Sequence, residues 1–252
     1  MPEILDWFVS AKPVFNQKYV YLTMYRAICF DLFNTLVSVG SVPLSVGRTT
    51  ADVLGVDARA WNHACFSEHH EICSPTNHVD VIRTLAHQLD PEIPLGVIED
   101  ATRQRQARFD YALTHHVHPA VVNTLEQLRH RGYGLALISN ASTAEVSAWP
   151  DSPLRPLFDL SIFSCDVGLK KPDPQIYHHT AKQLGVSTQA CLFVGDGGSN
   201  EHQGAHHSGM APVWLTQHLN TNTINRRQGE LKNYILAQFS HLEDIRHWLP
   251  GM

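Results

Sequence analysis

Polar side chains that could do chemistry stand at the ends of three apolar runs in this chain. Asp31 follows the first run, Ser139 and Asn140 end the second, and Asp196 follows the third. The runs themselves are residues 27–30, 135–138 and 191–194. Such runs predict buried parallel strands, and open α/β sheets bind their ligands at the carboxyl ends of those strands. We therefore expect these polar groups to converge at one edge of a sheet.

A cation and a second carboxylate complete this set. Lys171 lies in a loop that Pro172 and Pro174 stiffen, and Glu201 follows shortly after Asp196. Phosphoryl transfer needs a nucleophile and neutralisation of the charge on the equatorial oxygens. A carboxylate nucleophile, a hydroxyl, a cation and an acidic cluster suit that chemistry, and the combination is more specific than any of its members.

Each of these residues also has an ordinary structural interpretation when it is taken alone. Asp31 and Asp196 can cap a helix or close a turn, and Ser139 can simply end its strand. Lys171 can be a solvated surface lysine, and Glu201 can occupy the first turn of a helix, where negative charge is favourable. Convergence favours the functional interpretation for all except Glu201, which stays open between metal ligand and helix residue.

The elements that must position these groups alternate between strands and helices. This pattern predicts right-handed βαβ crossovers and an α/β fold, a Rossmann-like, doubly wound and mostly parallel sheet. The core is expected to consist of residues 24–40 and 116–249 and to close with a helix over residues 239–249. Between its two parts, residues 41–115 show helical stripes separated by Gly and Pro, as at Val79–Leu89. They predict an inserted helical domain.

The composition excludes several classes of function. The chain has 252 residues and a net charge of −5, which gives no electrostatic footprint for nucleic acid. No apolar stretch is long enough to span a bilayer. The five cysteines form no CxxC pattern and are typical of reduced thiols in a cytoplasmic protein. We expect a cytoplasmic monomer or homodimer that acts on a small molecule, with neither nucleic acid nor a membrane as partner.

The first 23 residues stand apart from this pattern. Glu3 and Asp6 interrupt their apolar character, so they make a poor signal peptide. Met24 directly precedes the first strand, and we expect the domain to start there, with residues 1–23 a loosely attached extension or a start-site artefact. An amphipathic docking helix within this segment is the alternative.

The 17 histidines suggest metal binding, but their spacing does not favour it. Adjacent pairs such as His69 and His70 point about 100° apart on a helix and cannot chelate one ion together. His202 and His206 lie one turn apart, yet no HExxH motif accompanies them. We expect these two to lie on a solvated helix face.

Taken together, the motifs resemble those of the haloacid dehalogenase-like hydrolase superfamily over about residues 24–249. The resemblance rests on the strand with Asp31 and Thr35, on Ile138-Ser139-Asn140, on Lys171-Pro-Asp-Pro174 and on the motif from Val194 to Glu201. Their order and spacing match, and residues 41–115 resemble the helical cap of that family.

This resemblance implies roles for individual residues. Asp31 would form an aspartyl-phosphate, Ser139 would hydrogen-bond the phosphoryl group, and Lys171 would stabilise both the carboxylate and the phosphate. The further residues expected to bind the phosphate are Asn34, Thr35 and Asn140.

The resemblance also implies a Mg²⁺ site. Asp31, Asp196 and the backbone carbonyl of Phe33 would hold the ion, and Glu201 would add a direct or water-mediated contact. Oxygen-only ligation agrees with Mg²⁺ chemistry on independent grounds. The implied activity is hydrolysis of a small phosphorylated metabolite, under a cap that closes over the site and excludes water.

Phe33 departs from the pattern of the phosphatases in this family. They usually carry a second Asp two residues after the nucleophile, which protonates the leaving group and then activates water. A positioned acid or base contributes about 10² to 10⁴ in rate. Without it, alkyl phosphates should be poor substrates, whereas acyl and aryl phosphates, whose leaving groups need no proton, should suffer less.

Phe33 also leaves two alternative functions open. The family's carbon–halogen hydrolases lack the second Asp and often carry an aromatic residue there, which favours a 2-haloacid dehalogenase acting through an aspartyl ester. Against it, a cluster of Asp31, Asp196 and Glu201 would repel itself without a cation, and displacing halide needs no metal. We therefore favour Mg²⁺-dependent phosphoryl chemistry. The third alternative is a degenerate member that binds a phosphorylated ligand without turnover.

Overall fold

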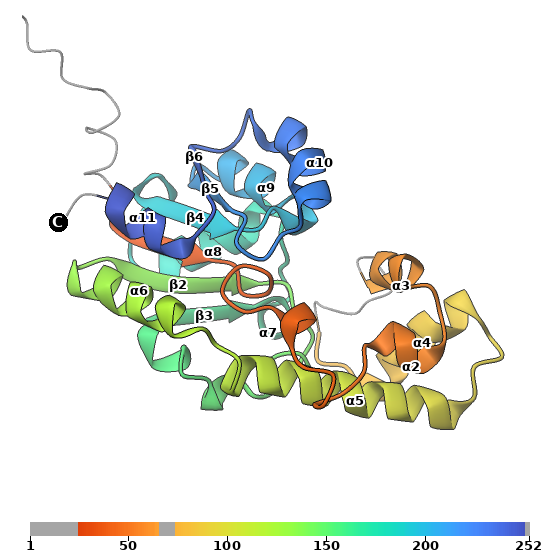
Figure 1. Ribbon diagram of the computed structural model, residues 1–252. Helices are drawn as coiled ribbons and strands as arrows, with labels where there is room; N and C mark the ends of the chain where they lie inside the picture. Colours follow the sequence, from red (N-terminus) through yellow and green to blue (C-terminus); the bar gives the residue numbers. More distant parts are fainter. Residues whose placement is uncertain (1–24, 66–73, 250–252) are drawn as a thin grey trace, which may run out of the picture.

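A parallel sheet organises the molecule. The computed structural model describes residues 25–65 and 74–249, and these form a six-stranded sheet in the order β3-β2-β1-β4-β5-β6 (Figure 1). All neighbouring strands are parallel. The strands are β1 (Ala27–Phe30), β2 (Gly134–Ser139), β3 (Leu160–Phe163), β4 (Cys191–Gly195), β5 (Ala211–Leu215) and β6 (Ala237–Phe239). With helices on both faces, this is the predicted doubly wound, Rossmann-like α/β fold.

Helices connect the strands and also form a separate group. The helices of the sheet domain are α6 (Pro119–His130), α7 (Ser164–Val167), α8 (Pro174–Gln183), α9 (Glu201–His207), α10 (Thr221–Leu231) and α11 (Leu242–Trp248). The helices between β1 and α6 are α2 (Thr50–Leu54), α3 (Ala58–Cys65), α4 (His78–Leu89) and α5 (Leu95–Thr114).

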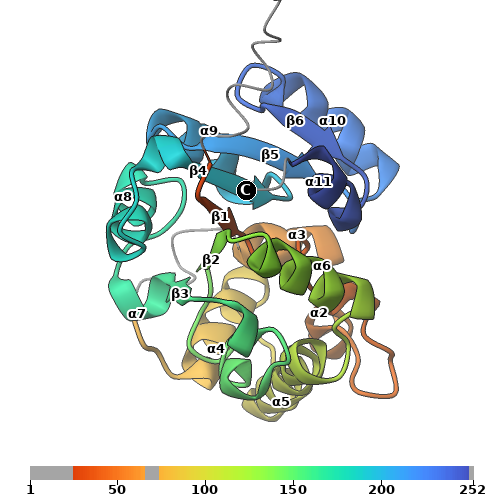
Figure 2. The same ribbon diagram turned by 90° about the vertical axis from the view of Figure 1, so that its left-hand side faces the viewer.

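The two faces of the sheet have separate hydrophobic cores, because successive side chains of a strand point to opposite faces. Ile28 and Phe30 of β1 pack with residues of α6 and α11 on one face. Ala27 and Cys29 pack with residues of α8 and α9 on the other. Figure 2 shows these two helix pairs on opposite sides of the strands. Every residue of β1 is buried, which explains its continuous apolar run.

Helices α2 to α5 share a third hydrophobic cluster of their own. It includes Trp61 of α3, Ile82 and Leu85 of α4, and Ile98 of α5, all buried. In Figure 1 this helical group lies to one side of the sheet, and α5 extends from it back toward the sheet domain. The group corresponds in position to the predicted insert, and the boundaries 41–115 stay a prediction.

The carboxyl-terminal part of the fold differs from the prediction. The helix expected from residue 239 begins only at Leu242, because Phe239 lies in β6, where its carbonyl accepts a hydrogen bond from Thr216 N at 3.0 Å. Helix α10 was not predicted at all. Leu231 is its one buried residue, so it shows no apolar stripe that sequence periodicity could detect.

Cys29, Cys65, Cys165 and Cys191 are free thiols, as predicted for the cysteines that the structure describes. The expected extension of residues 1–23 lies outside the described residues. Among the described residues, no helix combines the length and apolarity that crossing a membrane requires.

A close backbone approach holds α9 against the loop that carries Lys171. A Cβ atom added to Gly204 would stand 2.3 Å from the carbonyl oxygen of Pro172. Gly204→Ala must displace this backbone and is expected to lower the free energy of unfolding by about 1–3 kcal/mol, measured by urea denaturation. Gly229→Ala in α10 is the control, because its Cβ would meet nothing within 4 Å. Equal stability of the two variants would contradict this account of Gly204.

Candidate active site

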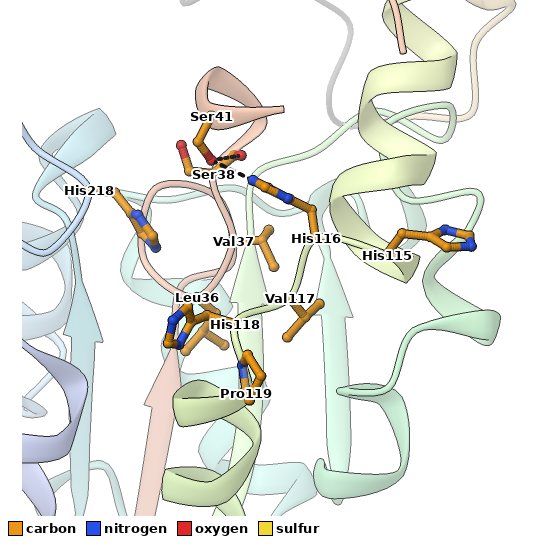
Figure 3. A pocket seen from close by; sticks show the side chains of 10 residues that line it. All are labelled: Leu36, Val37, Ser38, Ser41, His115, His116, Val117, His118, Pro119 and His218. Atoms are coloured by element: carbon orange, nitrogen blue, oxygen red, sulfur yellow. Dashed lines mark hydrogen bonds between the residues drawn. The ribbon is translucent and has the colours of Figure 1, made fainter. Parts of the chain in front are cut away.

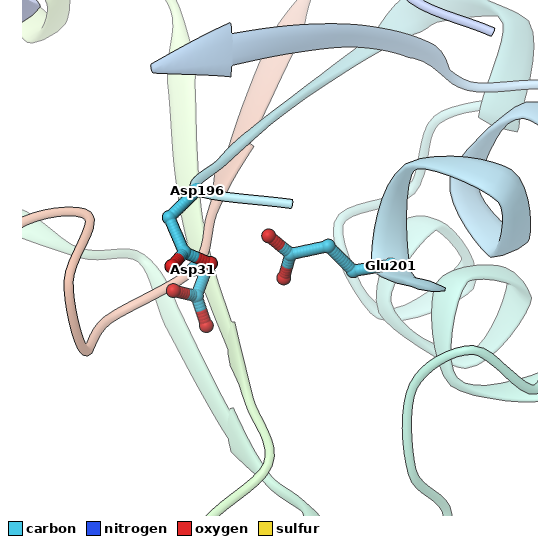
Figure 4. A group of neighbouring side chains, drawn as sticks. All are labelled: Asp31, Asp196 and Glu201. Carbon is cyan, nitrogen blue, oxygen red and sulfur yellow. The ribbon is translucent and has the colours of Figure 1, made fainter. Parts of the chain in front are cut away.

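The carboxyl ends of three neighbouring strands bring the predicted site residues together. Strands β2, β1 and β4 are adjacent, so Ser139, Asp31 and Asp196 leave the sheet at the same edge. Glu201 joins them from the start of α9. One carboxylate oxygen from each of Asp31, Asp196 and Glu201 lies within 4.8 Å of the other two, and all three residues are buried (Figure 4).

Lys171 lies between two of these carboxylates. Its Nζ donates to Asp31 Oδ1 at 2.5 Å and to Glu201 Oε2 at 2.7 Å, and only 2% of its side chain is exposed. Asn140 holds the Lys171 main chain from both sides, since its Oδ1 accepts from Lys171 N at 2.8 Å and its Nδ2 donates to Lys171 O at 2.9 Å. The Asn140 amide therefore positions the cation, and its predicted contact with phosphate stays a prediction.

The loop after Asp31 orients its carboxylate. Thr35 is buried, and its Oγ1 donates to Asp31 Oδ2 at 2.8 Å. Asn34 makes this turn possible, because it adopts a left-handed backbone (φ 59°) that Asn tolerates better than most residues. Its side chain is exposed, so among the predicted phosphate-binding residues Thr35 contacts the carboxylate directly and Asn34 shapes the turn.

Ser139 is the one predicted site residue whose hydroxyl is left without a partner among the described residues. Its Oγ is buried and makes no hydrogen bond. A buried hydroxyl without a partner costs free energy, so such a group marks a place where something else can bind. A phosphoryl oxygen would satisfy it.

Asp196 has a partner that the sequence did not reveal. Arg227 of α10 donates from Nη1 to Asp196 Oδ2 at 3.1 Å and to the Asp196 carbonyl at 2.7 Å, while Trp214 Nε1 donates to the same carbonyl at 2.9 Å. The other carboxylate oxygen, Oδ1, accepts from Gly198 N at 2.8 Å. Arg227 lies in the unpredicted helix α10, and nothing in its local sequence marks it as a site residue.

These cations change the charge balance expected of the acidic cluster. Lys171 is shared by Asp31 and Glu201, and Arg227 pairs with Asp196. When all three carboxyls are ionised, they carry one negative charge more than the cations beside them. The acidic cluster therefore does not need a metal ion to balance all of its negative charge. The argument from the sequence against a metal-independent reaction assumed that it does.

Burial and mutual repulsion perturb the protonation of the site. Burial raises the pKa of Asp31 to about 7, with the carboxylates of Glu201 and Asp196 adding to the rise and Lys171 opposing it. Burial likewise raises the pKa of Glu201. Burial alone would lower the pKa of Lys171, but Asp31 and Glu201 outweigh it and hold that pKa above its ordinary value. Lys171 therefore stays charged, and Asp31 is the group that titrates near neutral pH.

The oxygen atoms of the cluster fit a hard divalent cation. Carboxylate oxygens are the ligands that such ions prefer, and the three in reach of one another come from Asp31, Asp196 and Glu201. The unpartnered hydroxyl of Ser139 at the same edge suits an anionic group that such an ion would accompany. A cation entering here would compete with Lys171 and Arg227 for the same oxygens.

Phe33, at the position where the resemblance implies an acid, joins the sheet domain to α5. Its half-buried ring meets the ring of Phe109 edge to face, with centroids 5.1 Å apart. The guanidinium of Arg105 lies 4.6 Å above the Phe109 ring and pairs with Glu145 at 2.5 Å, in the segment after Asn140. The position is thus an apolar contact, with no proton donor on the Phe33 side chain itself.

The expectation that His202 lies on a solvated face is wrong. His202 is fully buried, its Nε2 lies 3.1 Å from the carbonyl oxygen of Val213, and its ring packs edge to face on Phe193. Burial lowers its pKa to about 4, so the ring is neutral at physiological pH. His206, one turn later, is exposed as expected.

A hollow of about 280 Å³ lies away from the carboxylates. It is bounded by residues 36–38, 41, 115–119 and 218, which belong to the two links between the sheet domain and helices α2 to α5 or to the segment after β5 (Figure 3). His116 crosses it and bonds Ser41 at 3.1 Å, whereas His115 points away in the same view. None of the predicted site residues lines this hollow, so it marks the junction of the two parts.

The raised pKa of Asp31 predicts how stability depends on pH. The folded-state pKa of about 7 exceeds the ordinary 3.8, so the favourable contribution of this carboxyl is complete below pH 4 and is lost as the pH rises through 7. In EDTA at pH 8, Asp31→Asn buries no charge and should exceed the wild type in free energy of unfolding by up to about 4 kcal/mol. The difference should vanish toward pH 4.

Denaturant titrations at both pH values measure this difference. The exposed Asp244→Asn serves as control and is expected to leave the pH profile unchanged. An Asp31→Asn variant no more stable than the wild type at pH 8 would refute the prediction.

Comparison with known proteins agrees with the geometry. A family model described as haloacid dehalogenase-like hydrolase matches residues 25–209. A phosphoglycolate phosphatase of Pseudomonas putida is 30% identical over 241 residues, which cover 91% of this chain and 80% of that protein. An (S)-2-haloacid dehalogenase 4A of Burkholderia cepacia is 27% identical over 228 residues, 86% of this chain and 89% of that protein.

A solved structure supports the fold. The L-2-haloacid dehalogenase of Xanthobacter autotrophicus with chloropropionic acid covalently bound is 18% identical and has a TM-score of 0.63, over 90% of this chain and 99% of that one. The family model covers well over half of this chain, including the segments of Asp31, Ser139, Lys171 and Asp196. The chain is therefore an enzyme that belongs to the haloacid dehalogenase-like hydrolases.

Proposed function

We propose that this hydrolase is a Mg²⁺-dependent phosphatase of a small phosphorylated metabolite, with Asp31 as the nucleophile. The observation that carries the proposal is the site itself: a buried acidic cluster, a fixed ammonium group and an unpartnered hydroxyl at one sheet edge. Relatives named phosphoglycolate phosphatase and glyceraldehyde 3-phosphate phosphatase support a substrate of this class.

Four residues of the chain have separate roles in the proposed reaction. Asp31 attacks phosphorus, forming an aspartyl-phosphate as the bond to the leaving oxygen breaks and the leaving group departs as its anion. Water then hydrolyses this acyl phosphate, which releases inorganic phosphate and restores the Asp31 carboxylate. Thr35 and Lys171 hold the carboxylate in place, and Lys171 also meets the charge on the phosphoryl oxygens. Ser139 donates its hydroxyl to one of these oxygens.

Mg²⁺, held by Asp31, Asp196, Glu201 and the main-chain carbonyl of Phe33, would supply electrostatic stabilisation of the phosphoryl group. The part played by the chain is to present these oxygens together. Asp196 is set by Gly198 N, and Glu201 by Gly197 N at 2.8 Å and by Lys171.

We propose that residues 41–115 are a cap that closes over this site and selects the substrate. Helices α2 to α5 have their own hydrophobic cluster and are joined to the sheet domain by two links. Helix α5 supplies Phe109 beside Phe33, and Arg105 pairs with Glu145 of the sheet domain. These contacts exclude water from the space next to the Asp31 carboxylate.

A second candidate is hydrolysis of a carbon–halogen bond in a 2-haloacid through an aspartyl ester. Two observations favour it: an apolar Phe33 beside the nucleophile, and cations that already compensate most of the carboxylate charge. The relative named (S)-2-haloacid dehalogenase 4A supports it as well.

Hydrolysis assays with and without Mg²⁺ test the proposal. Aryl and acyl phosphates should be turned over in Mg²⁺ but not in EDTA, and Asp31→Asn should reduce turnover by at least about 10³-fold, since it removes the nucleophile. Halide release from a 2-haloacid in EDTA would establish the second candidate instead. If BeF₃⁻ with Mg²⁺ raises the melting temperature and no ester is hydrolysed, the chain is a binding protein without turnover.

Phe33→Asp tests whether the missing acid limits the reaction. A carboxyl at this position should protonate the leaving alkoxide and raise kcat for alkyl phosphates at least about tenfold, since a positioned acid is worth about 10² to 10⁴. Phe33→Leu is the matched control, because it also loses the ring contact with Phe109 but adds no acid. Equal turnover by the two variants would show that another step limits the reaction.

A further inference from the structure

Arg227 is the one charged residue in contact with the acidic cluster, among the described residues, that the proposed mechanism does not use. Its Nη1 lies 3.1 Å from Oδ2 of Asp196, and 18% of the Arg227 side chain is exposed against 8% for Asp196. The pair is therefore mostly removed from water, where the attraction between opposite charges and the repulsion between like charges are both stronger than at the surface.

Helix α10 packs closely against the loop that follows Asp196. Gly197 has a positive φ of 86°, and a Cβ there would stand 2.8 Å from Leu231 Cδ1 and 3.5 Å from Arg227 Cδ. The side chain of Leu231 and the aliphatic part of Arg227 thus both pack against Gly197. The helix delivers the guanidinium to Asp196 in a set position, which an exposed arginine on a free helix would not have.

Arg227 and a divalent cation would compete for the carboxylate of Asp196. Asp196 is a ligand of the proposed Mg²⁺ site, and its Oδ2 already receives the guanidinium while Oδ1 receives Gly198 N. The Asp196 main chain does not need Arg227, because Trp214 Nε1 also donates to its carbonyl at 2.9 Å. The contribution specific to Arg227 is therefore its positive charge beside the ligand oxygen.

We propose that Arg227 is a positioning residue that orients Asp196 and, through its charge, raises the concentration of divalent cation that the site requires. This inference rests on the proposed Mg²⁺-dependent function. While no cation is bound, the guanidinium stands beside Asp196 and limits repulsion in the cluster. When a cation binds, the same guanidinium opposes it, so that occupancy responds to cation concentration rather than being saturated at all times.

Direct binding of Mg²⁺ tests this proposal without an activity assay. Isothermal titration with MgCl₂ of protein treated with EDTA and then desalted would compare wild type, Arg227→Met and Arg227→Lys. Methionine keeps the apolar stem against Gly197 and removes the charge, whereas lysine keeps the charge and loses the planar fork. The methionine variant should bind Mg²⁺ about tenfold more tightly, and the lysine variant should stay within about twofold of the wild type.

Arg226→Met is the control, since Arg226 is the exposed neighbour on the same helix and its loss changes the net charge equally. It should not alter the affinity. Equal effects of the methionine and lysine changes at position 227, or an unchanged or weaker affinity in Arg227→Met, would overturn the role assigned to the charge. If Arg227→Met fails to fold in EDTA, Arg227→Gln, which also removes the charge, takes its place in the comparison with the wild type.

The same titration separates this inference from the proposed function. If the wild type binds no Mg²⁺ and Arg227→Met does, the inference about Arg227 stands and Mg²⁺-dependent catalysis by the natural chain is refuted. If neither binds, both fail. If the wild type binds and Arg227→Met binds with the same affinity, only the inference about Arg227 fails.

Discussion

The ammonium group of Lys171, between Asp31 and Glu201, is the interaction on which the rest of the site depends. Two carboxylates buried side by side repel each other, and burying them is costly unless a cation and hydrogen bonds compensate. Lys171 contacts both at 2.5 and 2.7 Å. The surrounding structure holds Lys171 in place. Asn140 hydrogen-bonds its main chain on both sides, and Gly204 lets α9 approach the backbone of the adjoining Pro172.

The charge balance also explains why the site is compatible with two different reactions. Lys171 and Arg227 leave the three carboxylates with one net negative charge, so the cluster can remain folded without a metal and still attract a divalent cation. A carboxylate nucleophile, the role proposed for Asp31, is common to phosphoryl transfer and to displacement of halide from carbon. What separates the two reactions is the treatment of the leaving group, and that depends on Phe33 and on the cation rather than on the nucleophile.

Helix α5 connects this chemistry with the helical group. Arg108, buried on α5, donates to the carbonyls of Val39 and Gly47, each at 2.7 Å, and so holds the loop that leads out of the sheet domain. Three residues apart on the same helix, Arg105 pairs with Glu145 across the boundary. Closure of the proposed cap would have to break these contacts or move them with it, and α5 is the element that would transmit this closure to Phe33.

The fold and most of the candidate site could be predicted because their signals are local. A fully buried parallel strand must be apolar throughout, so β1, β2 and β4 appear in the sequence as uninterrupted runs, and the polar residues after them mark the ligand-binding edge. Asp31, Ser139 and Asp196 follow from this reasoning, Lys171 was predicted from its Pro-stiffened loop, and Glu201 stayed open between metal ligand and helix residue. The structure places all five at that edge. Thr35 and Asn140 were named too, but which atoms they hold could not be deduced from spacing.

Contacts between distant segments were decided only by the tertiary structure. Helix α10 buries little and β6 is short, so neither has a periodic pattern, and Arg227 could not be connected with Asp196 from 31 positions away. His202 resembled a surface residue because burial depends on what packs over it, here Phe193 and the strand of Val213. The sequence by itself determined the strands, the candidate nucleophile and the Phe at position 33, since each depends on residue type and local order. Charge compensation depends on distances across the fold, and only the folded chain decides those.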